Sequence, residues 1–78
     1  MKIGDRVITT HSGNRYHLGW EGSSRFMHAN VEAIITKLQN DFVNDGYNDT
    51  VQVRTDDGAY YVRCARYLKI VELHYEIY

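Results

Sequence analysis

Residues 50–73, TVQVRTDDGAYYVRCARYLKIVEL, carry the clearest structural signal in the chain. Asp57-Gly58 is a preferred two-residue hairpin turn, because a type I′ turn needs positive φ at both central residues. This turn pairs Val53 with Val62 and gives the hairpin one largely apolar face and one polar, aromatic face. The apolar face carries Val51, Val53, Thr55, Tyr60, Val62 and Cys64, and the other carries Gln52, Arg54, Tyr61 and Arg63. We therefore predict a tight β-hairpin whose apolar face lies on the core.

The segments on either side of this hairpin favour three more strands. Ala65-Arg66-Tyr67 interrupts the alternation, which predicts one 3-10 turn, and residues 68–73 then predict a final strand. Residues 1–10 predict a first strand that has a bend at Gly4-Asp5 and points Ile3, Val7 and Thr9 inward. Residues 31–38 predict a second strand. A helix is the competing interpretation there, but the β-branched residues favour a strand.

Two longer connections separate the predicted strands. Residues 11–30 contain glycines, cationic groups and aromatics, and loops of this length are usually functional or disordered. We expect this loop to be ordered, because its apolar residues can fold back onto the strands. Residues 39–49 predict a polar connection with a turn at Asp45-Gly46, in which Phe42 and Tyr47 are candidate partner contacts.

The length of 78 residues allows one small domain, which we assign to residues 1–73 with a short tail at 74–78. The net charge of −1 provides no basic field for nucleic acid. Cys64 is the only cysteine, so no intrachain disulfide forms, and we expect it to be a buried hydrophobe. No apolar run suits a membrane span or a signal peptide, which favours a cytoplasmic protein that does not enter membranes. The sequence makes no prediction of oligomeric state.

Taken together, the elements predict an all-β fold: a small five-stranded barrel with a long first loop, a tight hairpin and a 3-10 turn before the last strand. This layout resembles the SH3-like small barrels. The segment Lys2-Ile-Gly-Asp-Arg-Val7 also resembles the opening strand of KOW-type barrels, and residues 53–62 resemble their distal hairpin. The glycine-rich KOW signature is poorly matched at residues 19–22.

These resemblances carry different functional implications. Peptide-binding SH3 domains would imply recognition of proline-rich ligands, but the chain lacks their Ala-Leu-Tyr-Asp-Tyr-like segment and the Trp after the second variable loop, so that activity is not carried over. The small size and dense loops also resemble accessory proteins of bacteriophages.

The long loop holds the first group of candidate binding residues. Aromatics interleaved with cations suit a protein hot spot or base stacking. The alternative is that Trp20 and Phe26 close one end of the barrel while the cations stay solvated. The candidates in this group are Arg15, Tyr16, His17 and Trp20, with Arg25, Phe26 and His28 nearby.

The second group lies on the outward face of the predicted hairpin. Arg54, Tyr61 and Arg63, together with Arg66, would form a basic-aromatic stripe able to meet phosphates or an acidic partner. The alternative is a set of ordinary solvated strand residues, in which Tyr61 packs on an arginine stem.

No catalytic or metal-site pattern emerges. The acidic residues Asp41, Asp45 and Asp49 do not fit a calcium loop, because Val43 and Gln52 stand where that loop needs oxygen ligands. The histidines lack a recognised ligand spacing. We therefore expect no metal, no cofactor and no enzymatic activity. The expected function is a binding module for a protein partner, and the alternative is a KOW-like nucleic-acid module.

Overall fold

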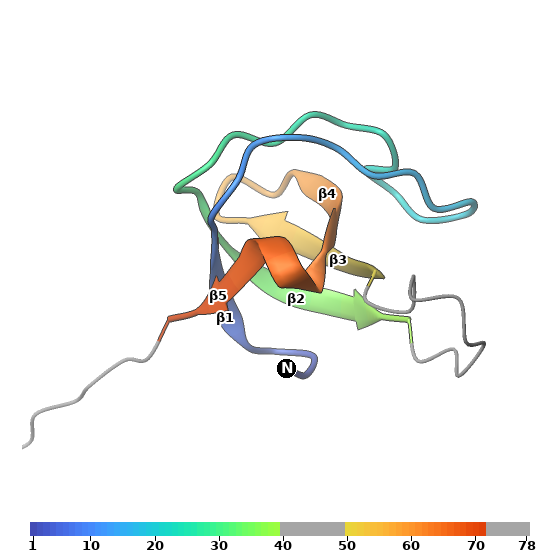
Figure 1. Cartoon of the computed structure of the whole chain (residues 1–78). Helices are drawn as coiled ribbons and strands as arrows, with labels where there is room; N and C mark the ends of the chain where they lie inside the picture. The colour runs from blue at the N-terminus through green and yellow to red at the C-terminus, as the bar shows by residue number, and fades with distance from the viewer. Residues whose placement is uncertain (40–49, 72–78) are drawn as a thin grey trace, which may run out of the picture.

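The computed structural model describes residues 1–39 and 50–71 (Figure 1). These residues form one antiparallel sheet of five strands in the spatial order β4-β3-β2-β1-β5. The strands are β1 (Arg6–Thr9), β2 (Glu32–Leu38), β3 (Thr50–Thr55), β4 (Tyr60–Cys64) and β5 (Leu68–Ile70), and the 3-10 turn η1 (Ala65–Tyr67) joins β4 to β5. The predicted all-β class, the number of strands and the 3-10 turn are confirmed. The turn at Asp45-Gly46 and the tail at 74–78 lie outside the described residues.

The sheet curls because its two edge strands are consecutive in the chain. β4 and β5 stand at opposite edges, yet only the three residues of η1 separate them. Three residues span at most about 10 Å, so the edges approach one another at this end. The curl gives the sheet an inner face, which holds the core, and an outer face.

The core on the inner face is built from β1, β2, β3, β5 and the long loop. Its buried members are Val7, Met27, Ala33, Ile35, Val51, Val53 and Leu68. Val7, Ala33 and Ile35 are buried as the alternation in their strands predicts. The inward position predicted for Ile3 is wrong, because β1 begins only at Arg6 and Ile3 stays 61% exposed before the bend at Gly4.

The second strand follows the strand interpretation and not the helical one. β2 pairs with β1 on one side and β3 on the other, and its register shifts between Ile35 and Lys37. That irregularity is a β-bulge, which bends the strand and helps the sheet to curl.

The predicted hairpin exists, but its predicted register is wrong by one residue. Val53 pairs with Tyr61 and not with Val62. The turn has three residues: the Gly58 N–H donates to the Thr55 carbonyl, and the Thr55 N–H donates to the Ala59 carbonyl, each at 2.9 Å. Among the three turn residues, only Gly58 has a positive φ (87°). The turn is therefore a type I turn that ends in a left-handed residue.

The observed register reverses the faces of β4. Val62 now pairs with Gln52, which places both on the outer face, whereas Arg63 pairs with Val51 on the inner face. The outer face is nonetheless buried at four positions: Thr50, Gln52, Val62 and Cys64 are at most 7% exposed. The burial predicted for Cys64 is therefore confirmed, but beneath a cover on the outer face and not in the core.

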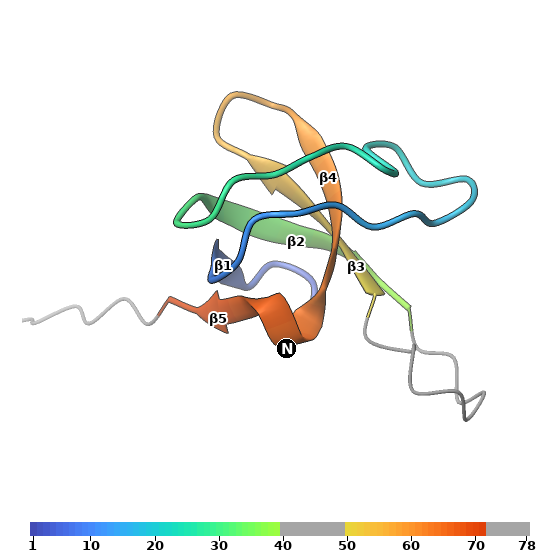
Figure 2. The same ribbon diagram turned by 45° about the horizontal axis from the view of Figure 1, so that its top comes forward.

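The middle of the long loop (residues 11–30) provides this cover through Arg15 and Glu21, whereas His11 and Met27, near its ends, contact residues of the inner face. In Figures 1 and 2 the loop runs from the end of β1 across β2, β3 and β4 and returns to the start of β2. Its two arms meet at one isolated bridge, where Gly13 and Met27 exchange N–H···O bonds of 2.9 and 2.7 Å. Met27 enters the core, while Phe26 is 53% exposed. The alternative that placed Phe26 over one end of the barrel is therefore wrong, and Met27 is the buried side chain of that arm.

Candidate functional site

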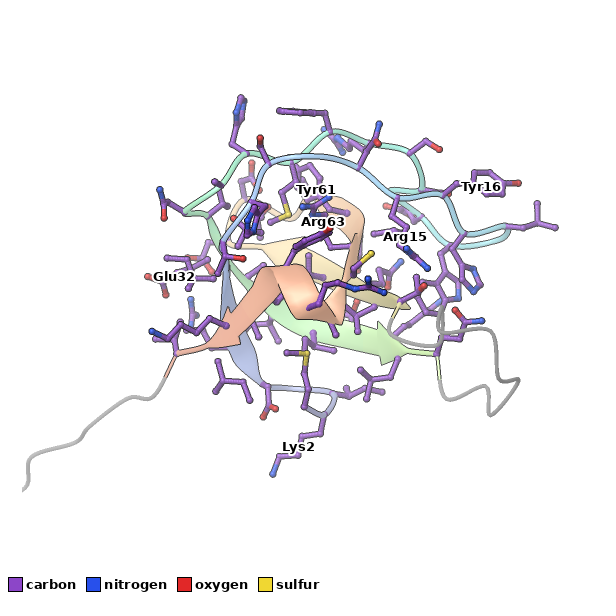
Figure 3. The ribbon with its side chains drawn as sticks, viewed as in Figure 1. Lys2, Arg15, Tyr16, Glu32, Tyr61 and Arg63 are labelled. Carbon is purple, nitrogen blue, oxygen red and sulfur yellow. The ribbon has the colours of Figure 1, made fainter. Side chains whose placement is uncertain are left out.

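The eight residues predicted to bind a partner separate into a loop group and a strand group. Arg15, Tyr16, His17 and Trp20 lie on the long loop, whereas Arg54, Tyr61 and Arg63 belong to β3 and β4, and Arg66 belongs to η1. Figure 3 shows Tyr16 pointing outward at one end of the molecule, while Arg63 points into its middle. One continuous binding surface does not include all eight.

Arg15 fastens the long loop to the outer face of the sheet. Its Nε donates to the Thr50 hydroxyl at 2.7 Å, and its Nη1 donates to the Cys64 sulfur at 2.8 Å. These contacts join residues that are 35 and 49 positions apart in the chain. Arg15 is half-buried, and its guanidinium holds the loop to β3 and β4.

A second contact fastens the loop a few residues further on. The Gln52 side-chain amide donates to the Glu21 carbonyl at 3.0 Å, and its oxygen accepts from the Thr36 hydroxyl at 2.6 Å. Gln52 is only 3% exposed, and both ends of its amide are satisfied. Leaving such a group unpaired costs about 1–3 kcal/mol, so this side chain holds the loop in place.

The loop backbone also approaches the β4 edge without room for a side chain. A Cβ on Gly22 would lie 2.3 Å from the Tyr60 carbonyl oxygen, and Gly22 has φ of +87°. Only glycine satisfies both conditions, because other residues avoid this left-handed region and carry the Cβ. Gly22 therefore fixes the distance between the loop and the sheet.

Inside the loop, His17 and Trp20 pack against each other. Their rings stack with centroids 3.9 Å apart at an angle of 16°. The backbone N–H of His17 donates to the Ser23 hydroxyl at 2.7 Å. Lys37 of β2 places its Nζ 6.0 Å from the Trp20 ring centroid. Both rings are half-buried, so they stiffen the loop and still offer an edge to solvent.

The apolar side chains that flank this stack are exposed. Tyr16 is 65% exposed and Leu18 is 78% exposed, the largest values among the large hydrophobic residues described. We call Tyr16, His17, Leu18 and Trp20 the loop-tip surface. Leu18 was not among the predicted binding residues. It was expected, with the other apolar residues of the loop, to fold back onto the strands, and its exposure shows that this expectation is wrong for Leu18.

The basic-aromatic stripe predicted on the hairpin does not form. Arg63 is 2% exposed, so its predicted outward position is wrong, and the cause is the register, which turns it to the inner face. Tyr61 is half-buried beside the core, and Arg54 is exposed. Arg66 is exposed on η1.

Arg63 is a buried cation that holds the start of the long loop. Its Nη2 donates to the His11 carbonyl at 2.8 Å, and its Cζ lies 5.6 Å from the Tyr67 ring centroid. Its Nε has no hydrogen-bond partner, and no carboxylate of residues 1–39 or 50–71 forms an ion pair with it. A partner cannot reach this guanidinium while residues 11–13 stay in place.

The described part of the chain offers little for other kinds of site. No group of three or more His, Cys, Asp or Glu side chains converges there in a way that suits a metal ion. None of the helical segments described has the length and apolar character needed to cross a membrane. An open hollow near the hairpin turn is lined by Glu32, Asp56, Asp57 and Tyr61, among others. The sequence analysis did not group the three acidic residues, because they meet only through the pairing of β2 with β3.

Comparison with known proteins gives no relative from which a function can be transferred. No protein-family model, no curated protein and no solved structure matches the chain significantly.

Proposed function

We propose that this chain is a non-enzymatic binding module that recognises a protein partner through the loop-tip surface. One observation carries the proposal: Tyr16 and Leu18 are exposed at 65% and 78% on a loop that is fastened to the sheet by several contacts. Tyr and Trp are enriched among the residues that dominate binding at protein interfaces. A loop that is ordered before binding also loses less conformational entropy when it binds.

An SH3-like barrel is part of the same proposal. The strand order β4-β3-β2-β1-β5, the long loop after β1 and the 3-10 turn before β5 support it. The resemblance to bacteriophage accessory proteins makes a host or virion protein in the cytoplasm the expected partner.

The KOW-like nucleic-acid module is the weaker hypothesis. It depended on Arg15, Arg54, Arg63 and Arg66, but Arg63 is buried and Arg15 is bonded to Thr50 and Cys64. Binding to phosphates gains from several accessible cations at once, because each phosphate contact releases counterions. Only Arg54 and Arg66 of this set are exposed.

Capture from cell lysate with tagged variants tests the proposal. Nuclease treatment and two salt concentrations separate a protein partner from nucleic acid, whose binding falls steeply as salt rises. The double variant Tyr16→Ser with Leu18→Ser should lose the captured protein by at least about tenfold, which corresponds to about 1.4 kcal/mol.

The matched control is Ile3→Ser, which removes another apolar side chain that is 61% exposed. Its neighbour Lys2 lies well away from Tyr16 in Figure 3. Ile3→Ser should capture the partner as the unchanged protein does. Equal capture by the double variant, or capture of nucleic acid alone, would contradict the proposal.

A further inference from the structure

The hollow near the hairpin turn lies away from the loop-tip surface. It opens between the start of β2 and the turn that joins β3 to β4, and its volume is about 430 Å³. Figure 3 shows Glu32, at its rim, on the opposite side of the molecule from Tyr16. Binding pockets for small groups begin at about 300 Å³, so the hollow can admit a long side chain.

The walls of the hollow combine an aromatic ring with negative charge. The half-buried side chains of Tyr61 and Val31 give it an apolar part, and Glu32, Asp56 and Asp57 contribute carboxylates. All three carboxylates are ionised at neutral pH, as ordinary Asp and Glu side chains are. An anion would be repelled from this hollow, whereas a cation with an apolar stem fits it.

Two arginines of the chain already stand at these walls. Arg6 places Nη1 3.3 Å from Glu32 and Nη2 3.7 Å from Asp56. Arg25, from the long loop, places its Cζ 5.1 Å from the Tyr61 ring centroid. Neither arginine lines the hollow itself, but each contacts side chains that do, and those side chains therefore accept a guanidinium. Two arginines against three carboxylates leave one net negative charge at the site.

We propose that the hollow binds an arginine side chain of the protein partner, with its guanidinium on the Tyr61 ring in the place that Arg25 takes in the free protein. Asp56 and Asp57 then pair with the guanidinium, and Val31 contacts the aliphatic stem. Arginine suits the site better than lysine because its planar head stacks on a ring and forms two parallel hydrogen bonds to a carboxylate. The choice of a protein as the source rests on the function proposed above.

A short peptide tests this site without the partner. The probe is acetyl-Gly-Gly-Arg-Gly-Gly-amide, added to the isotope-labelled full chain and followed by NMR. We expect saturable shifts at the amides of residues 30–32, 55–58 and 61, with a dissociation constant on the order of millimolar, as suits a single charged contact. The same peptide with citrulline, which keeps the shape and lacks the charge, should bind at least tenfold more weakly.

Two variants sharpen the result. Asp56→Asn should weaken binding of the arginine peptide several-fold. Arg25→Gln should tighten it several-fold, because it removes the side chain that competes for the Tyr61 ring. An unchanged spectrum of the remaining amides verifies that each variant is folded. Equal binding of the citrulline peptide, absence of shifts around the hollow, or unchanged affinity in Arg25→Gln would overturn the proposal. These outcomes are independent of the capture experiment on Tyr16 and Leu18, so the two proposals can fail separately.

Discussion

The β3–β4 hairpin and the long loop lie against each other and are held in place by different means. The hairpin is a regular ladder of five residue pairs, closed by a three-residue turn. The long loop has one isolated bridge between its arms and is held by scattered contacts, among them those of Arg15, Gln52 and Arg63 and a close approach at Gly22. The comparison shows that a segment without regular secondary structure can be fixed by a few buried polar contacts and one glycine.

Gly22 and Gly19 provide the sharpest way to test this difference. Both have φ of +87°, but a Cβ on Gly22 would meet the Tyr60 carbonyl at 2.3 Å, whereas a Cβ on Gly19 meets nothing within 4 Å. Gly19→Ala should cost about 1 kcal/mol, from the backbone conformation alone. Gly22→Ala should cost about 3 kcal/mol or more, because the loop must also lift from β4.

Thermal and urea unfolding of the two glycine variants measures these costs. Equal destabilisation would mean that the loop does not approach β4 as closely as described. A Gly22→Ala chain that fails to fold, beside a folded Gly19→Ala chain, would agree with the account.

Arg15 of the long loop and Arg54 of the hairpin allow a second comparison of the two regions, again by the change in stability. Arg15→Met removes the bonds to Thr50 and Cys64 while it keeps an unbranched apolar stem. We expect a loss of about 1–3 kcal/mol, because the hydrogen bonds of a charged donor are lost from the outer face. Arg54→Met, at an exposed position of β3 close to the hairpin turn, should change stability by less than about 0.5 kcal/mol.

Hydrogen exchange shows where the Arg15→Met effect falls. Faster exchange should be concentrated in residues 13–27 and should spare the β3–β4 ladder. Uniform acceleration across both regions would indicate that the loop and the hairpin open as one unit.

The sequence predicted correctly those features that neighbouring residues determine, such as the existence of the hairpin. It failed for features that contacts between distant segments determine, such as the register of the hairpin. Alternating apolar residues around Asp57-Gly58 predicted a hairpin, but Asp-Asp-Gly is compatible with two-residue and three-residue turns. What distinguishes these turns is the burial of Gln52 and Val62 beneath a loop more than twenty residues earlier. No local pattern carries that information.

The candidate site was also predictable only where local sequence decides the position of a side chain. Tyr16 was predicted as a binding residue because it stands among cations in the long loop, and it is exposed as such a residue must be. Arg63 was misplaced because the shift in register moved it from one face to the other. That Arg15 holds the loop to the sheet was not predictable, because its hydrogen-bond acceptors are 35 and 49 residues away in the sequence.

The turn of the hairpin should respond to a change at its own glycine. Gly58 has φ of +87° with open space around a Cβ. Gly58→Ala should therefore cost about 1 kcal/mol, and Gly58→Asn should cost less, because Asn tolerates the left-handed region better. Unfolding curves of the two variants check the order. Greater stability in Gly58→Ala would contradict the described turn.

The smallest expected effect is the pH dependence that the Asp57 carboxyl gives to the stability of the hairpin turn. A hydrogen bond from the Thr55 hydroxyl lowers the pKa of Asp57, and the Ala59 N–H adds a second bond. Because the pKa of this carboxyl is lower in the folded chain than in the unfolded chain, it stabilises the folded chain at pH values above the ordinary pKa of 3.8. This stabilisation is lost as the pH falls through the pKa of the folded chain. The Ala59 amide shift, followed between pH 6 and about pH 2, should titrate with a midpoint below 3.8. A midpoint above that value would contradict the bond, and Asp57→Asn should abolish the step.

The most direct test of the central claim is amide hydrogen exchange of the free chain, residue by residue. The claim is that the long loop is fastened to the sheet before any partner binds. It predicts that the amides of Gly13, His17, Ser24 and Met27, all hydrogen-bonded, exchange much more slowly than amides of an unstructured chain. Exchange of these four amides at unstructured rates, beside a protected β3–β4 hairpin, would contradict it.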